Sequence, residues 1–214
     1  MADLFAPEEG GWLERLSSGA VLLHRRASDI DALLLAEVEA LLRQAPPRGM
    51  QTPGGRAMSV ITSSCGGYGW VSDARGYRYA ERDPLSGLPW PAMPAPFRAL
   101  AEAAAAEAGF PGFAPDACLI NCYAPGAKMS LHQDKDERDF SAPIVSVSLG
   151  LPAVFLFGGF SRAERPGRIE LRHGDVLVWG GPDRMRFHGV LPVAEGEHPL
   201  LGRRRINLTF RKAR

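Results

Sequence analysis

The chain has 214 residues, of which 45% are hydrophobic and 23% are charged, and its formal net charge is +1. These values lie near the averages for soluble globular proteins, so they exclude a disordered chain and a protein whose whole surface attracts nucleic acid. The sequence has no apolar run near the roughly 18 residues that a membrane helix needs. We therefore expect one domain spanning 1–214 and no membrane partner. We also expect the protein to act as a monomer.

The N-terminal segment and the cysteines indicate the compartment. Residues 1–9 are acidic where a secretory signal would be basic and then apolar. Cys65, Cys118 and Cys122 form neither a zinc-like cluster nor an even set for disulfides. We predict a cytoplasmic protein in which all three cysteines are packing residues.

Two helices are expected in the first half of the chain. The first spans 29–43, where apolar residues recur at helical spacing, with Ser28 as its cap and the proline pair 46–47 as its end. The second spans 96–108 and is rich in alanine and glutamate. Both are predicted to brace the outside of the fold.

The segment 50–90 has a different composition. It is dense in glycine, proline, aromatic and polar residues, with turn signals at 52–55 and 65–70. This pattern indicates short hairpins that form a mobile cover.

From residue 117 the pattern changes to short β-type runs with Gly, Pro and Asp between them. The predicted strands are 117–123, 144–149, 153–157, 168–172, 176–179, 189–192 and 205–211. Such spacing is typical of a sandwich or jelly roll. The predicted fold class is mainly β with flanking helices (α+β): a double-stranded β-helix, or jelly-roll, barrel over 117–211, braced by the helices of the first half.

The run 205–211 alternates between apolar and polar residues. Its polar positions are Arg205, Asn207, Thr209 and Arg211. One interpretation is a solvated outer face, as on many antiparallel strands. However, Asn121 and Tyr123 also share a face of their strand, and a barrel interior lined by Arg, Asn and Tyr would suit a carboxylate. We therefore predict an internal cavity.

A histidine and an aspartate two positions apart, His132 and Asp134, are followed much later by His188. Two imidazoles and one carboxylate are the ligands of the facial triad that holds non-haem Fe(II) and leaves positions open for a co-substrate and O₂. An oxygenase is the hypothesis. A second pair, His173 and Asp175, encloses a glycine and precedes an apolar run, which indicates a tight turn feeding a strand.

The order of these motifs resembles the AlkB family of Fe(II)- and 2-oxoglutarate-dependent nucleic-acid dealkylases. The resemblance covers nearly the whole chain, including 52–55, Trp70, 116–121, 131–136 and 207–211. It implies that Fe(II) is held by His132, Asp134 and His188, with O₂ as the oxidant. It also implies that 2-oxoglutarate is held by Asn121, Tyr123, Arg205, Asn207 and Arg211.

The resemblance makes the segment 50–90 a nucleotide-recognition cover. The substrate-binding residues that it implies are Trp70, Tyr77, Arg78, Tyr79, Asp136 and Arg162. Trp70 would stack on an extruded base, Tyr77 and Tyr79 would flank the base and its phosphate, and Asp136 would face its exocyclic amine or positive charge. Taken alone, Trp70 is also explained as a packing aromatic, and Asp136 as a solvated loop charge.

The implied function is oxidative demethylation of N-alkylated bases such as 1-methyladenine and 3-methylcytosine. The substrate would be alkylated single-stranded or duplex DNA, or RNA, and the products formaldehyde, succinate and CO₂. Two alternatives stay open. The first is an oxygenase acting on a protein or small molecule, and the second is a nucleic-acid-binding module without catalysis.

Overall fold

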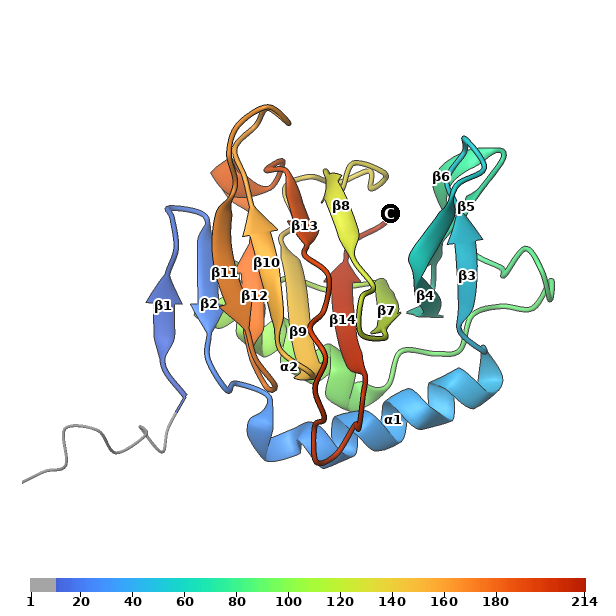
Figure 1. The fold of residues 1–214 in the computed structure, drawn as a ribbon, viewed down its shortest axis with the longest axis horizontal. Coiled ribbons are helices and arrows are strands. Elements are labelled where there is room, and N and C mark those ends of the chain that lie inside the picture. Colours follow the sequence, from blue (N-terminus) through green and yellow to red (C-terminus); the bar gives the residue numbers. More distant parts are fainter. Residues whose placement is uncertain (1–10) are drawn as a thin grey trace, which may run out of the picture.

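The structure is a computed structural model that describes residues 11–214, so the acidic segment 1–9 lies outside the described residues. Two antiparallel sheets face each other, and a small third sheet stands beside them (Figure 1). The larger sheet has the order β1-β2-β12-β9-β14-β7-β4-β3. The smaller sheet has the order β11-β10-β13-β8, and β5 pairs with β6. This is the mainly β, two-sheet arrangement expected of a jelly roll.

The strands of the second half have nearly the predicted bounds. They are β7 (Ala117–Tyr123), β8 (Met129–His132), β9 (Ile144–Gly150), β10 (Ala153–Phe157), β11 (Gly167–Leu171), β12 (Val176–Trp179), β13 (His188–Val190) and β14 (Arg205–Arg211). The prediction did not include β8 as a strand. It began β13 one residue late, because Gly189 was taken as its first residue. All seven residues of β14 are buried, so the solvated-face interpretation is wrong.

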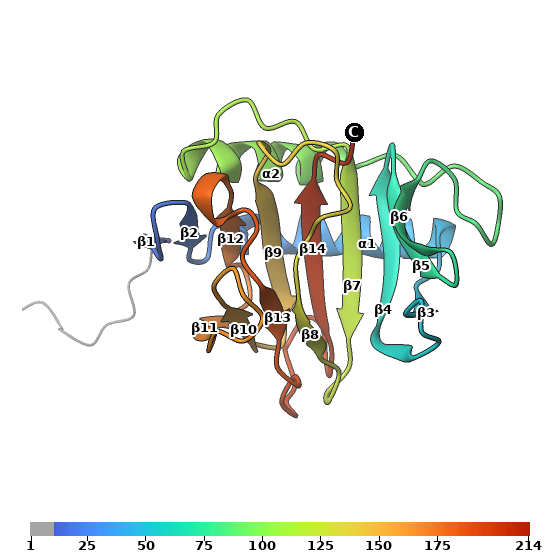
Figure 2. The ribbon, with the colours of Figure 1, turned by 90° about the horizontal axis from the view of Figure 1, so that it is seen from above.

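The two helices lie against one face of the larger sheet (Figures 1 and 2). They are α1 (Asp31–Gln44) and α2 (Ala95–Glu107). Leu34, Val38 and Phe97 pack in one core with the apolar side chains of β9, β12 and β14. A second core fills the space between the two sheets. The prediction that the helices brace the barrel is confirmed.

The predicted cap of the first helix is wrong. Ser28 begins a short 3₁₀ helix, Ser28–Ile30, and α1 starts only at Asp31, with no side-chain capping bond. The 3₁₀ turn moves Ser28 three residues away from the first α-helical residue, so its hydroxyl is out of place for the α-helix amides that a cap serves.

The segment 50–90 is only partly a separate unit. β3 (Arg48–Gln51) and β4 (Ala57–Gly66) are the last two strands of the larger sheet, and β4 pairs with β7. Only β5 (Gly69–Asp73) and β6 (Gly76–Ala80) form the independent hairpin. We call this hairpin, residues 69–80, the cover hairpin.

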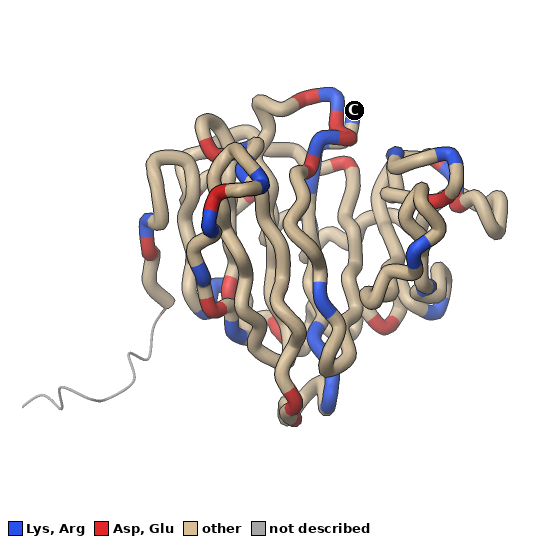
Figure 3. The backbone as a smooth tube through the Cα atoms, turned by 45° about the horizontal axis from the view of Figure 1, so that its top comes forward, with Lys and Arg blue, Asp and Glu red and all other residues tan. Residues whose placement is uncertain are grey.

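The prediction also missed the first two strands. β1 (Leu13–Arg15) is exposed along its length, and β2 (Ala20–Leu23) is a four-residue run buried against β12. Both are too short to show periodicity. Neither described helix is long and apolar enough to cross a membrane. Basic and acidic residues are interspersed over the tube of Figure 3, in agreement with the small net charge.

Phe210 links the larger sheet to α2. Its ring is fully buried and meets Phe97 edge-on, with 6.0 Å between ring centroids. We expect Phe210→Ala to lower the free energy of unfolding by about 3–5 kcal/mol, because it removes apolar contacts and leaves a cavity. Phe160→Ala is the matched control, since Phe160 is 57% exposed and should cost less than about 1 kcal/mol. Denaturant unfolding of both variants measures the difference, and equal losses would contradict this account of the core.

Candidate active site

Pairing of β8 with β13 brings the two predicted histidine ligands together. His132 ends β8, His188 begins β13, and the two are direct partners in the antiparallel register. Their ring centroids are 4.3 Å apart. Asp134 lies two residues beyond the end of β8 and points its carboxylate between the rings. Its oxygens are 3.6 Å from Nε2 of His132 and 3.7 Å from Nε2 of His188.

The geometry fits a metal ion. One ligand atom from each residue lies within 4.8 Å of the others. Nδ1 of His132 is 2.9 Å from the Ser130 carbonyl oxygen, and Nδ1 of His188 is 3.1 Å from that of Arg186. A carbonyl oxygen only accepts, so Nδ1 carries the hydrogen in each ring and Nε2 offers its lone pair to the metal.

Burial and nearby charge set the protonation states that a metal needs. Burial, reinforced by His132, lowers the pKa of His188 to about 3, so its imidazole is neutral at pH 7. Burial alone would raise the pKa of Asp134, but Arg211 and the two histidines outweigh it and hold that pKa well below its usual range. Asp134 and His188 are thus already deprotonated where a metal would bind.

The inner faces of β7 and β14 carry the polar residues predicted for the co-substrate. Asn121 lies opposite Asn207, and its amide nitrogen donates to the Asn207 side-chain oxygen at 3.0 Å. Asn207 in turn donates to Ser146 on β9 at 2.8 Å. Tyr123 is buried two residues further along β7, on the same face and opposite Arg205. The structure therefore brings together all four of these residues between the sheets.

Arg205 is buried with most of its donors unused. It is 1% exposed, and Nη2 donates to the Ser148 hydroxyl at 3.1 Å. Its Nε and Nη1 have no hydrogen-bond partner within residues 11–214. Burial lowers its pKa, and the opposing effects of Tyr123 and Asp175 offset this only in part. A buried guanidinium with two free nitrogens fits a bound carboxylate, which would accept both hydrogen bonds.

Arg211 has a different setting from Arg205. Its Nε and Nη2 donate to Oδ2 of Asp134 at 2.8 and 2.6 Å. The sequence placed both arginines on the co-substrate, but the structure pairs Arg211 with the carboxylate of the triad. Burial would lower the pKa of Arg211, but Asp134, Tyr79 and Glu137 raise it above its ordinary value. The guanidinium therefore stays charged beside the triad.

Through Trp70, the cover hairpin contacts the loop that follows Asp134. The Trp70 ring stacks on that of Tyr77, with 5.5 Å between centroids and 14° between planes. Its indole N–H donates to Oδ2 of Asp136 at 2.8 Å. Trp70 also packs on the small apolar cluster of Met50, Val71 and Trp90, so the packing interpretation is correct in part. Asp136 is a partner of the hairpin, not a solvated charge.

Three predicted substrate residues lie in settings the sequence did not indicate. Tyr79 is buried, and its hydroxyl donates to Oε1 of Glu137 at 2.7 Å. Arg78 forms a two-point ion pair with Asp73 on the partner strand of the hairpin. Arg162 is exposed, with its guanidinium carbon 5.3 Å from the centre of the Phe187 ring. Tyr79 is therefore in the buried network around the triad, whereas Arg162 lies on the surface.

Sequence reasoning missed two charged residues of the site. Glu137 and Arg184 are buried and form an ion pair with 3.0 Å between Nη2 and Oε2. Glu137 sits in the run 135–139, which has the composition of a solvated loop. Arg184 follows a short 3₁₀ helix, Gly181–Asp183. Neither position carries a periodic signal that would have shown its burial.

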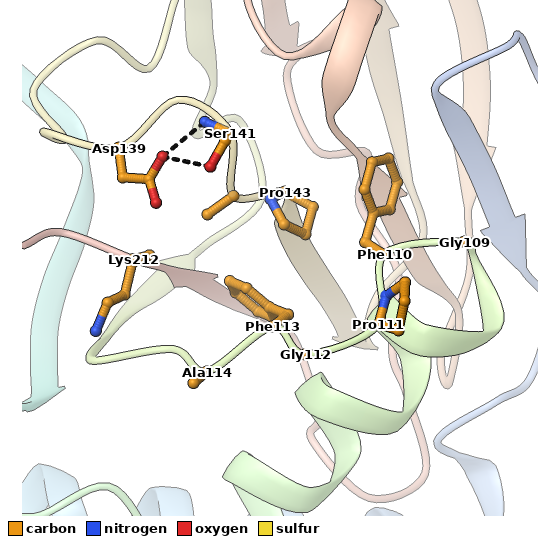
Figure 4. Close-up of a pocket in the computed structure, with 11 residues that line it drawn as sticks. Gly109, Phe110, Pro111, Gly112, Phe113, Ala114, Asp139, Ser141, Pro143 and Lys212 are labelled. Carbon is orange, nitrogen blue, oxygen red and sulfur yellow. Dashed lines mark hydrogen bonds between the residues drawn. The ribbon is translucent and has the colours of Figure 1, made fainter.

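A surface cavity of about 430 Å³ lies away from the triad, beside the loop that follows α2. Figure 4 shows Phe110, Phe113 and Pro143 around it, with Lys212 and Asp139 at its rim. None of the three triad residues lines this cavity. The cluster His132, Asp134 and His188 is the one metal-ligating group in the described part of the chain. The second His-x-Asp pair is a turn, as predicted, with Gly174 at φ +85°.

Comparison with known proteins identifies the family of the chain. The chain matches the profile of the 2OG-Fe(II) oxygenase superfamily over residues 19–211. It is 54% identical to the alpha-ketoglutarate-dependent dioxygenase AlkB of Salmonella typhimurium, over 100% of this chain and 98% of that protein. It is 33% identical to the DNA N(6)-methyladenine demethylase ALKBH1C of Arabidopsis thaliana, over 77% of this chain and 42% of that one. The solved structure of OsALKBH1 superposes with a TM-score of 0.80 at 30% identity, covering 94% of this chain and all of the other.

The chain belongs to the 2OG-Fe(II) oxygenase superfamily and, within it, to the AlkB family. It is an Fe(II)- and 2-oxoglutarate-dependent dioxygenase, and its cofactor and co-substrates are Fe(II), 2-oxoglutarate and O₂. The jelly-roll prediction is confirmed.

Metal binding should stabilise the folded chain. We expect Mn(II), used in place of Fe(II) at about 100 times its Kd, to raise the free energy of unfolding by about 2.7 kcal/mol, because only the folded chain assembles the three ligands. His188→Ala should lose this increment. His173→Ala should keep it, since His173 belongs to the turn and binds the Gly150 amide and Asp31. Equal increments in both variants, measured by thermal or denaturant unfolding, would contradict the assignment.

Arg205 should lower the stability of the ligand-free protein and be needed for binding of 2-oxoglutarate. We expect Arg205→Met to raise the free energy of unfolding of the ligand-free protein by about 1–4 kcal/mol, because an unpaired charge leaves the interior. The same variant should lose 2-oxoglutarate binding, measured by calorimetry with Mn(II) present. Arg204→Met is the control: Arg204 is half-exposed and pairs with Glu39 on the surface, so both quantities should stay close to wild type. A destabilised Arg205→Met variant that still binds 2-oxoglutarate would refute the interpretation.

Proposed function

We propose that this dioxygenase removes methyl groups from N-alkylated bases, such as 1-methyladenine and 3-methylcytosine, in single-stranded or duplex DNA or in RNA. The observation that carries the proposal is the bond between Trp70 and Asp136. This hydrogen bond holds the aromatic ring of Trp70 against Asp136, which is two residues along the chain from the metal ligand Asp134. The relatives named as an AlkB dioxygenase and a DNA demethylase support a nucleic-acid substrate.

In this proposal His132, Asp134 and His188 hold the iron, and the buried polar side chains of β7 and β14 hold 2-oxoglutarate. Arg205 binds a carboxylate through its two unpaired nitrogens, and the buried side chains of Asn121, Tyr123 and Asn207 complete the binding site. Arg211 neutralises the buried charge of Asp134, and in this proposal it also contributes to binding 2-oxoglutarate. When bound, the iron with 2-oxoglutarate and O₂ supplies the oxidation that releases the N-methyl carbon as formaldehyde, with succinate and CO₂ as the other products.

The cover hairpin holds the base. A base acted on by an enzyme must leave the stack, and aromatic side chains hold it when it does. Trp70 and Tyr77 already lie parallel on the hairpin, and a cationic methylated base adds a cation–π attraction of about 0.5–2 kcal/mol to such a ring. Asp136 supplies a carboxylate for the positive charge or the exocyclic amine. Methylated bases would therefore be preferred over their neutral parents.

The remaining substrate contacts lie around this centre. Arg78 is anchored by Asp73 but keeps part of its side chain exposed. Arg162 is exposed beside Phe187 and would contact a phosphate of the substrate. Tyr79, on β6 of the hairpin, anchors the hairpin through the hydrogen bond that its buried hydroxyl donates to Glu137.

We propose one domain over 1–214, with 117–211 as its jelly-roll core and 50–90 carrying the cover. The enzyme would act as a monomer in the cytoplasm, where the free thiols of Cys65, Cys118 and Cys122 would stay reduced.

Trp70 should be needed for base repair and not for folding. With a single-stranded oligonucleotide carrying 1-methyladenine, Fe(II), 2-oxoglutarate and O₂, we expect wild type to release formaldehyde and succinate in equal amounts. Trp70→Ala should lose about tenfold or more in kcat/KM, since stacking contributes about 1–3 kcal/mol per base. Trp12→Ala is the matched control, because Trp12 is half-exposed near the far edge strand β1 and stacks on His24.

Two outcomes would count against the proposal. Succinate released without base repair would indicate an oxygenase with a protein or small-molecule substrate. Binding of the methylated oligonucleotide with no consumption of 2-oxoglutarate would indicate a module without catalysis.

A further inference from the structure

Asp134 is held differently from the two histidines of the triad. His132 and His188 lie on paired strands, whereas residues 133–137 have no regular structure. No backbone ladder therefore fixes Asp134, and its place depends on side chains. The contacts that fix it come from Arg184, whose Nη1 donates to the Asp134 carbonyl oxygen at 2.8 Å, and from Arg211, which binds the Asp134 carboxylate.

Glu137 joins these two arginines. Oε2 accepts from Nη2 of Arg184 at 3.0 Å, and Oε1 lies 3.4 Å from Nε of Arg211. The side chains are 2% exposed for Glu137 and 3% for Arg184. A charge-assisted hydrogen bond in such a desolvated setting is strong, and removing either partner leaves the other charge buried and uncompensated.

The same carboxylate reaches the cover hairpin. Oε1 of Glu137 also accepts the buried hydroxyl of Tyr79 at 2.7 Å. Tyr79 is the direct cross-strand partner of Trp70 in the hairpin, and Trp70 donates to Asp136, the neighbour of Glu137. Two consecutive carboxylates that follow the metal ligand thus bind one cross-strand pair of the cover.

We propose that Glu137 is a positioning residue that ties the cover hairpin to the metal ligand Asp134. It acts through Arg184 and Arg211 on one side and through Tyr79 on the other, and it does not itself touch the metal or the base. The inference rests on the proposed function for the role of the hairpin. Its physical content, a link between hairpin and metal ligand, is independent of which substrate the hairpin receives.

Two substitutions separate the two sides of this link. Glu137→Gln keeps the shape and an acceptor for Tyr79 but removes the charge between the arginines. Tyr79→Phe removes a single hydroxyl and leaves the ion pair intact. The control is Glu195→Gln, where a surface ion pair with Arg203 is 71% exposed on the glutamate side.

The test is Mn(II) affinity together with hydrogen exchange of the amides of residues 69–80, with and without Mn(II). Glu137→Gln should weaken Mn(II) binding about 10–100-fold, as loss of outer partners of metal ligands does. It should also speed exchange in the hairpin. Tyr79→Phe should leave Mn(II) affinity within about twofold, speed hairpin exchange by about tenfold, and remove any protection that Mn(II) confers there. Glu195→Gln should match wild type.

Activity adds a second readout. With the methylated oligonucleotide, Tyr79→Phe should raise KM about tenfold with kcat kept, because it loosens the substrate cover and not the metal ligands. If no oligonucleotide is turned over by wild type, the proposed function fails while the Mn(II) and exchange results still test the link. Unchanged hairpin exchange in Tyr79→Phe would overturn the inference. If Glu137→Gln folds, Mn(II) affinity equal to wild type would also overturn it.

Discussion

The interior between the two sheets contains charge, and the rest of the site depends on how that charge is compensated. Arg184, Arg205, Arg211, Asp134 and Glu137 are all buried. Removing ions from water costs several kcal/mol each, so each needs a partner inside the protein. Four of them meet that need in one network of two arginines and two carboxylates. Arg205 remains with a single hydroxyl partner, and a dicarboxylate co-substrate is the ligand that would complete it.

The register of the paired strands determines which side chains of the site lie next to one another. The antiparallel pairing of β8 with β13 sets the two histidines side by side, and their backbone contacts direct both Nε2 atoms toward Asp134. The pairing of β7 with β14 places Asn121 opposite Asn207 and Tyr123 opposite Arg205. A slip of one residue in either pair would turn these side chains to the opposite face of the sheet. The site is therefore a product of the same hydrogen bonds that hold the barrel.

The sequence was most informative where chemistry and periodicity agreed. The alternation of polar and apolar residues in 205–211 predicted the strand and its polar inner face. This alternation is present even though both faces of the strand are buried. The helices were found from apolar spacing, but the cap was not, since a 3₁₀ turn intervenes after Ser28. β3 and β4 were taken for part of a cover because their turn-rich neighbours dominated the composition. Local composition cannot show that β4 pairs with β7, from which it is separated by many residues in the sequence.

The charged partners of the triad were beyond sequence reasoning for a related reason. Glu137 lies in a run of loop charges, and Tyr79, 58 positions away, is what makes its surroundings a buried network. The same holds for Asp136 and Trp70. Contacts of this kind depend on how the hairpin packs on a loop that is distant in the sequence. The spacing of residues in a single sequence does not indicate them. Family resemblance named Asp136 and Trp70, but it did not indicate that the two are bonded to each other.

Arg205 and the His132–Asp134–His188 triad form one preorganised site, in which two unpaired nitrogens of the arginine can bind a carboxylate. A crystal structure of the protein with Mn(II) and 2-oxoglutarate, grown without O₂, tests this most directly. We expect the metal to be coordinated by both Nε2 atoms and an Asp134 oxygen, with a co-substrate carboxylate accepting from Nε and Nη1 of Arg205. A co-substrate bound elsewhere, with those two nitrogens still unpaired, would contradict it.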